Sequence, residues 1–370
     1  MRPAVKKILY WLAALVAVAV AYLLLGPVPI TPAAFSLPQA PGYVGPHTVN
    51  TKLANLKLID LKGEVGPEHI MIGPDGKLYT TVASGNILRM NPDGTAQEVF
   101  ANTGGRVLGF DFDAQGNMVA ADAVKGLLSI APDRKITVLT NSVNGDPIRY
   151  ADAVVVAKNG RMYFSDASGR FAPKDWGGTF EASVLDIIEG ASTGRLLEYD
   201  PATQATRVLA FGLSFANGVA LSADEQSLFV TETGKFRLWK IATSASGLSV
   251  AKPSPLATVV LDNLPGYPDN LMRGLDGKIW MGFAKPRNPV ADNMADKPWL
   301  RRLTLRLPRA LWPVPKSYGH VVAFTEDGKI VADLQDPSGA YPETTAVTET
   351  GDRLYVQSLH AHGLGWLPKP

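Results

Sequence analysis

Short apolar strands recur along most of the chain, and each follows a tight polar turn. Six segments show this pattern, roughly 40 to 75 residues apart. They read GPDGKLY, DAQGNMV, AKNGRMY, SADEQSLF, GLDGKIW and TETGDRLY. Turn signals at this spacing are typical of four-stranded propeller blades, and we expect each apolar pair to lie on the innermost strand of its blade. The pattern therefore predicts an all-β protein, a six-bladed β-propeller over residues 48–370. The segment from Thr48 to Leu61 has no such partner before it, so we expect it to supply the outer strand that closes the last blade.

An uninterrupted apolar run precedes this pattern. It extends from Ile8 to Leu25, about 18 residues, which is the lower end of what spans a bilayer as a helix. Arg2, Lys6 and Lys7 precede the run, so the positive-inside bias predicts a cytoplasmic N-terminus and a propeller that is periplasmic or extracellular. A cleavable signal peptide is the alternative, but its apolar core is usually shorter and ends at small residues. We therefore predict a single-pass membrane protein with an uncleaved N-terminal transmembrane helix.

Four stretches, including the apolar run, depart from the strand pattern. Residues 1–25 form the predicted cytoplasmic stub and anchor, and residues 26–47 form a Pro-rich linker, expected to be a stiff spacer. Residues 167–193 contain FEASVLDIIEG, which predicts a short helix, and residues 284–317 have a basic amphipathic pattern. The latter favours a helix packed on the propeller over a lid or a membrane-surface helix. Both long segments follow predicted inner strands, so we expect them to form the walls of a binding site on one rim.

Composition excludes several classes of function. Net charge is +2 with both signs interspersed, so nothing indicates a nucleic-acid partner. The chain has no cysteine, which excludes thiolate catalysis and cysteine-based zinc sites. It also has no GxSxG elbow, P-loop or GxGxxG motif after a strand, so serine hydrolase and nucleotide chemistry have no support.

A fixed distance before the apolar pair, five of the six repeats carry a residue that can bind a cation. Counting back eleven positions, or twelve where the turn is one residue longer, gives one residue per repeat. These six residues are Glu68, Leu108, Asp152, Asn217, Asp269 and Glu343. A shared register means a shared place in the repeat unit, so a closed ring would bring the five oxygen-bearing side chains to its axis. Only Leu108 breaks the pattern.

Converging carboxylates on a narrow axis predict a bound cation. Taken singly, Asp and Asn before strands usually satisfy backbone donors in turns. Together they would repel one another and lose hydration unless a cation neutralised them. Glu68, Asn217, Asp269 and the neighbouring Asn270 are hard oxygen ligands that suit Ca²⁺, with Mg²⁺ as the weaker candidate. Asp269 and Asp152 are also the candidate catalytic residues, because a carboxylate beside the ion could activate water or attack directly. For both, metal ligation or hydrogen bonding at a strand start is the alternative.

Histidines contribute little to this prediction. His69 follows Glu68 directly, so strand alternation turns it away and we interpret it as structural. His360 and His362 have HxH spacing, which is a weak metal signal without a third ligand.

These residues lie in motifs that resemble those of the strictosidine synthase-like proteins, including the adipocyte plasma membrane-associated protein group, within the paraoxonase and gluconolactonase superfamily of six-bladed propellers. The resemblance extends from about Gly66 to the C-terminus, and FANGV with GYPDN is its most specific part. It implies a central calcium held by Glu68, Asn217, Asp269 and Asn270. Where the superfamily has an Asn-Asp pair, this chain has Ala151 and Asp152, which removes one expected amide ligand.

The resemblance also bears on mechanism. Strictosidine synthases condense an amine with an aldehyde by means of a Glu near the start of the last inner strand. Glu343 lies close to that place, at least one residue out of step, so the role is not transferred. The histidine pair of paraoxonases has no counterpart, because no histidine lies between His69 and His320.

The leading hypothesis is a membrane-anchored, calcium-dependent hydrolase, similar to lactonases and arylesterases, that acts on a small-molecule ester or lactone. One alternative is a noncatalytic propeller in which calcium only stabilises the ring and the rim binds a ligand or a partner. Another is amine and aldehyde condensation, which requires Glu343 to enter the pocket unpaired. A carboxylate oxygen of Asp269 or Asp152 that faces free space would favour the enzyme.

Overall fold

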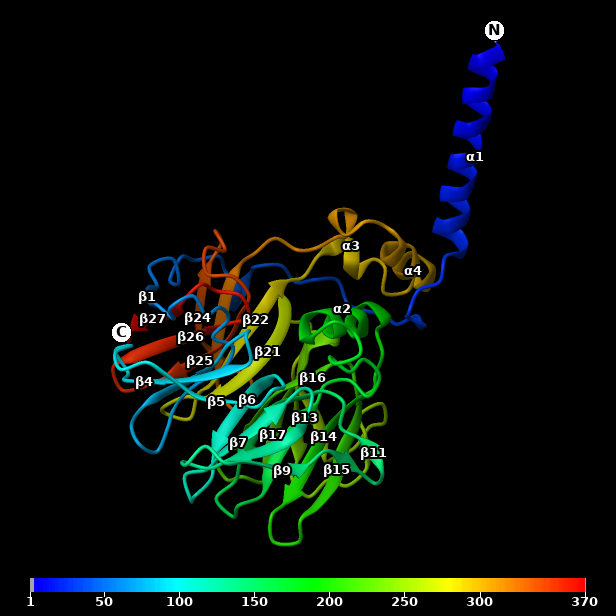
Figure 1. Ribbon diagram of the computed structural model, residues 1–370. Helices are drawn as coiled ribbons and strands as arrows, with labels where there is room; N and C mark the ends of the chain where they lie inside the picture. Colours follow the sequence, from blue (N-terminus) through cyan, green and yellow to red (C-terminus); the bar gives the residue numbers. More distant parts are fainter. Residues whose placement is uncertain (1–2, 370) are drawn as a thin grey trace.

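The strands form six main antiparallel sheets in the computed structural model, which describes residues 3–369 (Figure 1). The first sheet contains β2 (Ile70–Ile72), β3 (Leu78–Thr81), β4 (Asn86–Met90) and β5 (Glu98–Asn102). The second contains β6 (Val107–Phe112), β7 (Met118–Asp122), β8 (Gly126–Ile130) and β9 (Ile136–Thr140). The third contains β12 (Ala151–Val156), β13 (Met162–Asp166), β14 (Gly194–Asp200), β15 (Ala205–Leu213) and the short parallel β19 (Leu248–Ser249).

The remaining sheets complete the ring. The fourth contains β16 (Ala216–Leu221), β17 (Ser227–Glu232), β18 (Arg237–Ala242) and β20 (Ala257–Leu261). The fifth contains β21 (Gly266–Arg273), β22 (Ile279–Pro286), β23 (Gly319–Phe324) and β24 (Ile330–Asp336). The sixth contains β25 (Thr344–Glu349), β26 (Arg353–Ser358), β27 (Leu364–Pro368) and β1 (Lys57–Ile59). A separate hairpin pairs β10 (Ser142–Val143) with β11 (Asp146–Pro147).

The predicted six-bladed propeller is confirmed, but one detail of the prediction is wrong. The apolar pair that follows each turn lies on the second strand of its sheet, such as β3 or β13. The innermost strand comes before the turn, and neighbouring innermost strands contact one another around the axis, as in the pairs β12 with β16, β16 with β21, and β21 with β25. Each repeat segment therefore marks the hairpin between the first two strands. Gly76, with φ of 73°, takes the left-handed conformation that such a turn requires.

The ring closes with strands from both ends of the propeller. β1 pairs antiparallel with β27, with Lys57 opposite Trp366, so the N-terminal segment supplies the outer strand of the last sheet, as predicted. The core lies between neighbouring sheets, where strands are buried on both faces and are almost continuously apolar. All five residues of β7, for example, are buried.

The N-terminal helix projects away from the propeller (Figure 1). α1 (Pro3–Leu25) is long and apolar enough to cross a membrane, and none of its hydropathic window is buried within the protein. It begins before the predicted run, because the flanking Lys6 and Lys7 also adopt helical backbone. Arg2 lies outside the described residues. The orientation of α1 in a membrane remains a prediction.

Helices α2 (Thr179–Glu189), α3 (Pro289–Asp292) and α4 (Pro298–Arg306) gather on the rim that faces α1 (Figure 1). The described residues also form the 3₁₀ turns η1 (Gly45–His47), η2 (Thr233–Lys235) and η3 (Arg309–Leu311). α2 is the predicted helix in residues 167–193. α4 packs on the rim through buried Arg301, which donates to the carbonyl oxygens of Glu189 at 2.8 Å and Ala295 at 3.0 Å. Arg306 of α4 donates to the Gly26 carbonyl at 2.7 Å and to that of Leu23 at 2.9 Å, so the rim meets the C-terminal end of α1.

Residues 26–47, expected to form a stiff spacer between the membrane and the propeller, are bound to the rim. Ile30 is only 2% exposed, the Thr31 amide donates to Glu189 Oε2 at 2.9 Å, and the Phe35 amide donates to the Ala295 carbonyl at 3.1 Å. The linker therefore lies along the rim, because its apolar side chains and backbone groups find partners in α2 and in the α3–α4 segment.

Candidate functional site

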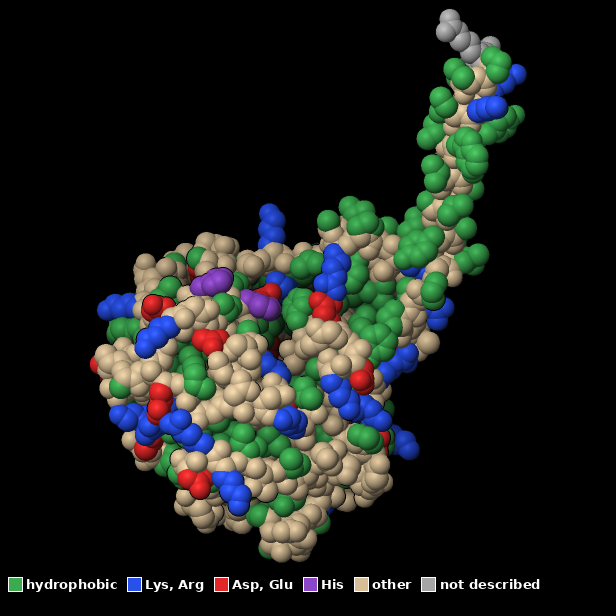
Figure 2. All heavy atoms as spheres, in the orientation of Figure 1, with side chains coloured by type: hydrophobic (Ala, Val, Ile, Leu, Met, Phe, Trp, Pro, Cys, Tyr) green, Lys and Arg blue, Asp and Glu red, His purple; other side chains and the backbone are tan. Residues whose placement is uncertain are grey.

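A cavity of about 580 Å³ lies between the propeller axis and the rim helices. All six positions of the shared register line it: Glu68, Leu108, Asp152, Asn217, Asp269 and Glu343. Its walls are mostly apolar and include Phe180 and Ile187 of α2, together with Trp312 beyond η3. Hydrophobic side chains also gather on the rim next to α1 (Figure 2). The cavity thus combines a charged axial floor with apolar walls.

Two innermost strands approach closely at the floor because a glycine separates them. Gly218 follows Asn217 on β16, and a Cβ atom there would lie 2.6 Å from the Asp269 carbonyl oxygen and 2.5 Å from the Leu271 nitrogen of β21. Only glycine fits this contact. Thr231 Oγ1 donates to the same Asp269 carbonyl at 2.7 Å. Asn217 and Asp269 are therefore brought together by backbone packing.

Two amide oxygens at the floor have no protein partner. Asn270 Nδ2 donates to the Glu68 carbonyl oxygen at 3.2 Å, which orients the amide. Its Oδ1 atom is buried and accepts no hydrogen bond from any described residue, and the same holds for Asn217 Oδ1. A buried carbonyl oxygen without a donor costs free energy, about 1–3 kcal/mol, unless something else satisfies it. Oxygens of this kind beside carboxylates suit a calcium ion.

Two of the four carboxylates in the shared register are paired with protein cations. Arg106 donates to Glu68 Oε2 and also to the Val82 carbonyl oxygen. Lys285 Nζ lies 2.7 Å from Glu343 Oε1, and His360 Nδ1 donates to Glu343 Oε2. These side chains neutralise Glu68 and Glu343.

Asp152 and Asp269 have no such partner among the described residues. Burial, followed by the negative charges of Asp269 and Glu68, raises the pKa of Asp152 well above its usual value. Burial and the charge of Glu68 likewise raise the pKa of Asp269, although the Asn217 amide opposes this rise. Without a cation, these two carboxylates therefore favour their protonated forms.

The Asp152 carboxylate meets the criterion for a reactive group. It lines the cavity, and no group in residues 3–369 donates a hydrogen bond to it. Glu343 also lines the cavity but is held by Lys285 and His360, so it fails the condition set for amine and aldehyde condensation. The sequence reasoning missed Arg106 and Lys285. Neither stands in the shared register, although Arg106 lies two residues before Leu108, where the register carries no oxygen.

His69 is buried beside this site but is not part of the cavity lining. Its ring centroid lies 4.8 Å from that of Phe110, and burial lowers the pKa of His69 from 6.5 to about 4. As pH falls, His69 is therefore protonated in the unfolded chain before it is protonated in the folded protein. The unfolding free energy that depends on neutral His69 is lost as pH falls from about 6.5 to about 4.

His69→Phe should remove this loss, because phenylalanine fills the same apolar contact without titrating. Between pH 7.5 and pH 5, we expect the wild type to lose about 2 kcal/mol more unfolding free energy than the variant. Denaturant unfolding at the two pH values measures the difference. Parallel pH profiles for the two proteins would contradict a buried neutral imidazole.

Comparisons with known proteins identify related sequences and a related fold. Residues 45–90 match the family model "Strictosidine synthase-like, N-terminal", and residues 152–246 match "Strictosidine synthase". Protein strictosidine synthase-like 13 of Arabidopsis thaliana is 35% identical over 242 residues, which span 64% of this chain and 57% of that protein. Human adipocyte plasma membrane-associated protein is 30% identical over 359 residues, 90% of this chain and 82% of that protein. A gluconolactonase from Xanthomonas campestris has a similar fold, with a TM-score of 0.62 and 18% identity over 93% of this chain and 99% of its own.

Proposed function

The chain belongs to the strictosidine synthase-like family, and on that premise we propose that it is a calcium-dependent hydrolase that opens a small ester or lactone in the axial cavity. The observation that carries this proposal is the balance between carboxylates and protein cations at the floor of the cavity. Glu68 and Glu343 are paired with Arg106 and Lys285, which leaves two negative charges, on Asp152 and Asp269, in a buried space. One divalent cation would neutralise both.

The ligand chemistry also fits calcium. The residues that would hold the ion are Glu68, Asn217, Asp269 and Asn270, and two of them offer buried amide oxygens without a donor. Carboxylate and amide oxygens are the ligands that calcium prefers. The Arg106 contact to Glu68 is the one feature that competes with the ion, so Glu68 would bind it with its second oxygen or after release from Arg106.

In this proposal Asp152 is the general base. When bound, calcium would polarise the substrate carbonyl and stabilise the developing oxyanion. Asp152 accepts a proton from water as the water oxygen bonds to the acyl carbon, and the proton then passes to the leaving alkoxide as the ester C–O bond breaks. Asp269 would bind the ion and neutralise part of its charge. The apolar walls bind the acyl or alkoxy part of the substrate and exclude water from the rest of the cavity.

The proposal extends to the membrane. α1 would anchor the protein with its N-terminus in the cytoplasm, because Lys6 and Lys7 precede the apolar stretch, and the propeller would be periplasmic or extracellular. The rim helices, and with them the cavity, would then lie on the side of the propeller nearest the anchor.

A noncatalytic, calcium-stabilised binding propeller is the second candidate. The protein cation already present at Glu68 favours it, since Arg106 shows that part of the axial charge is balanced for structural reasons. Condensation of an amine with an aldehyde is less favoured, because Glu343 is held in two ion pairs.

A substrate screen separates these functions. The purified full chain in detergent is assayed against aryl esters, lactones and phosphotriesters, with calcium and after chelation. We expect calcium-dependent turnover of an ester or a lactone. Calcium-dependent stability without turnover of any of these substrates would favour the binding propeller, and turnover unaffected by chelation would overturn the role of the ion.

A further inference from the structure

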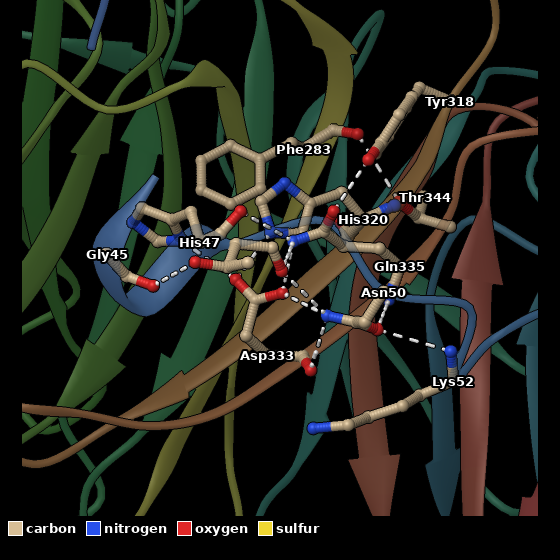
Figure 3. Close-up of polar contacts among 11 residues, drawn as sticks. Gly45, His47, Asn50, Lys52, Phe283, Tyr318, His320, Asp333, Gln335 and Thr344 are labelled. Atoms are coloured by element: carbon tan, nitrogen blue, oxygen red, sulfur yellow. Dashed lines mark hydrogen bonds and ion pairs between the residues drawn. The ribbon is translucent and has the colours of Figure 1, made fainter. Parts of the chain in front are cut away.

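A second polar cluster lies on the fifth sheet, away from the axial floor. His47 of η1, His320 of β23 and Asp333 of β24 meet there (Figure 3). His47 Nδ1 lies 2.8 Å from Asp333 Oδ2, and His320 Nε2 lies 2.9 Å from the same oxygen. All three are almost entirely buried. Within residues 3–369, this is the one group of three or more histidine and carboxylate ligands whose donor atoms all lie within 4.8 Å of one another.

The sheet and the linker each contribute a fixed part of this cluster. His320 pairs with Gln335 across β23 and β24, so Asp333, two residues before Gln335, projects from the same face at the diagonal position. His47 reaches this face from the linker, 286 positions before Asp333 in the sequence. The sheet thus positions His320 and Asp333, and the linker positions His47.

The donor atoms are close to the geometry of a tetrahedral metal site. Zinc binds imidazole nitrogen and carboxylate oxygen at about 2.0–2.2 Å, which places neighbouring ligand atoms about 3.3–3.5 Å apart. The two His–Asp separations need to widen by roughly half an ångström, and the two imidazole nitrogens already lie within 4.8 Å of each other. Side-chain rotations of this size need no movement of the strands.

The surroundings orient the cluster as supporting groups do around metal ligands. Asp333 Oδ1 accepts hydrogen bonds from Asn50 Nδ2 at 3.0 Å and from Gln335 Nε2, which leaves Oδ2 directed at the histidines. The His320 ring lies against Phe283, with centroids 4.5 Å apart, and is therefore fixed in position. Figure 3 shows these side chains converging between η1 and the two strands.

The tautomer of His320 can change when its Nε2 binds an ion. Its Nδ1 atom is buried and has no hydrogen-bond partner among the described residues. The Tyr43 hydroxyl is a second unpaired polar group in the same stack of rings, with the Tyr43 and His320 centroids 5.5 Å apart. A proton moved to Nδ1 thus meets no competing donor.

We propose that His47, His320 and Asp333 bind one zinc ion, with solvent in the fourth position, and that the ion fastens the linker to the fifth sheet. Borderline metals such as zinc prefer imidazole with a carboxylate, whereas calcium requires more oxygen ligands than this site offers. The site would fix the segment through which the apolar N-terminal helix is joined to the propeller. It is separate from the axial floor and does not depend on the function proposed for that cavity.

Zinc binding to the full chain in detergent tests the site. The protein is stripped with a chelator, saturated with calcium to occupy the axial site, and titrated with Zn²⁺ by calorimetry. We expect one zinc per chain in the wild type and at least a tenfold loss of affinity in His47→Gln, which removes a ligand from the edge of the site. The matched control is His362→Gln, which removes an exposed histidine outside the cluster and should bind zinc as the wild type does.

Two further readouts do not depend on a variant that folds. Zinc should raise the Tm of the calcium-saturated wild type, and X-ray absorption of the zinc form should count two imidazole ligands. Absence of zinc binding, equal affinity in His47→Gln, or a bound zinc without imidazole ligands would each overturn the proposal and leave a hydrogen-bonded His-Asp-His cluster.

Discussion

Asp269→Asn is expected to abolish the stabilisation of the protein by calcium and, with it, any ester or lactone turnover. The side chain supplies one of the two carboxylates that no protein cation neutralises, so its charge contributes directly to the proposed ion site. At a calcium concentration one hundred times Kd, the wild type should gain about 2.7 kcal/mol of unfolding free energy, or a rise in Tm of roughly 5 °C. A chelator should reverse this rise in the wild type and have no effect on the variant.

Without calcium, we expect the Asp269→Asn variant to be at least as stable as the wild type. Burial raises the pKa of Asp269, so its charged form destabilises the folded state at neutral pH, and this penalty grows as pH rises above the carboxyl pKa of the unfolded chain. Replacing the carboxylate with a neutral amide removes the penalty. Asp269→Asn should therefore melt at or above the Tm of the chelated wild type. Melting well below it would mean that the carboxylate supports the fold without an ion, contrary to the proposed site.

Asp152→Asn should lower kcat by two to three orders of magnitude while leaving calcium binding within a few-fold of the wild type. Asp152 lines the cavity and accepts no hydrogen bond from the residues that the structure describes, so it is the carboxylate available to take a proton from water. General base catalysis typically contributes about 10²–10⁴-fold to rate. The measurement is kcat on a substrate found in the screen, together with the calcium dependence of Tm for the same preparation.

Calcium binding by Asp152→Asn distinguishes a general base from a calcium ligand. Asp175→Asn is a suitable control, because Asp175 is exposed near the rim, close to Lys174 of the cavity lining, and should leave both quantities unchanged. If Asp152→Asn loses calcium binding as completely as Asp269→Asn does, then Asp152 is a ligand, and the proposed chemistry has no base at this position.

Much of the axial site could be anticipated from the repeat. Residues at equivalent places in a closed ring must approach the axis, so counting back from each apolar pair found Glu68, Asp152, Asn217, Asp269 and Glu343, all of which line one cavity. The same count succeeded although the strand assignment was wrong, because the innermost strand and the turn that follows it have nearly the same length in each repeat. The helix of residues 179–189 was also predictable, since its pattern is local.

Pairing between non-equivalent positions could not be anticipated. Arg106 and Lys285 neutralise Glu68 and Glu343, yet neither stands in the register, because a long flexible side chain reaches its partner from whichever strand end is near. The prediction for the linker, residues 26–47, missed contacts of the same kind. Its prolines indicated a stiff spacer, but buried Ile30 and the hydrogen bonds of Thr31 and Phe35 hold it on the rim.

By itself, the sequence determined the number of sheets, the closure of the ring and the set of oxygens that face its axis, because these follow from periodicity along the chain. Only the tertiary structure decided which of the axial carboxylates keep an uncompensated charge, and only it brought His47 to His320 and Asp333. These outcomes depend on contacts between segments up to 286 positions apart, whose distances no local pattern encodes.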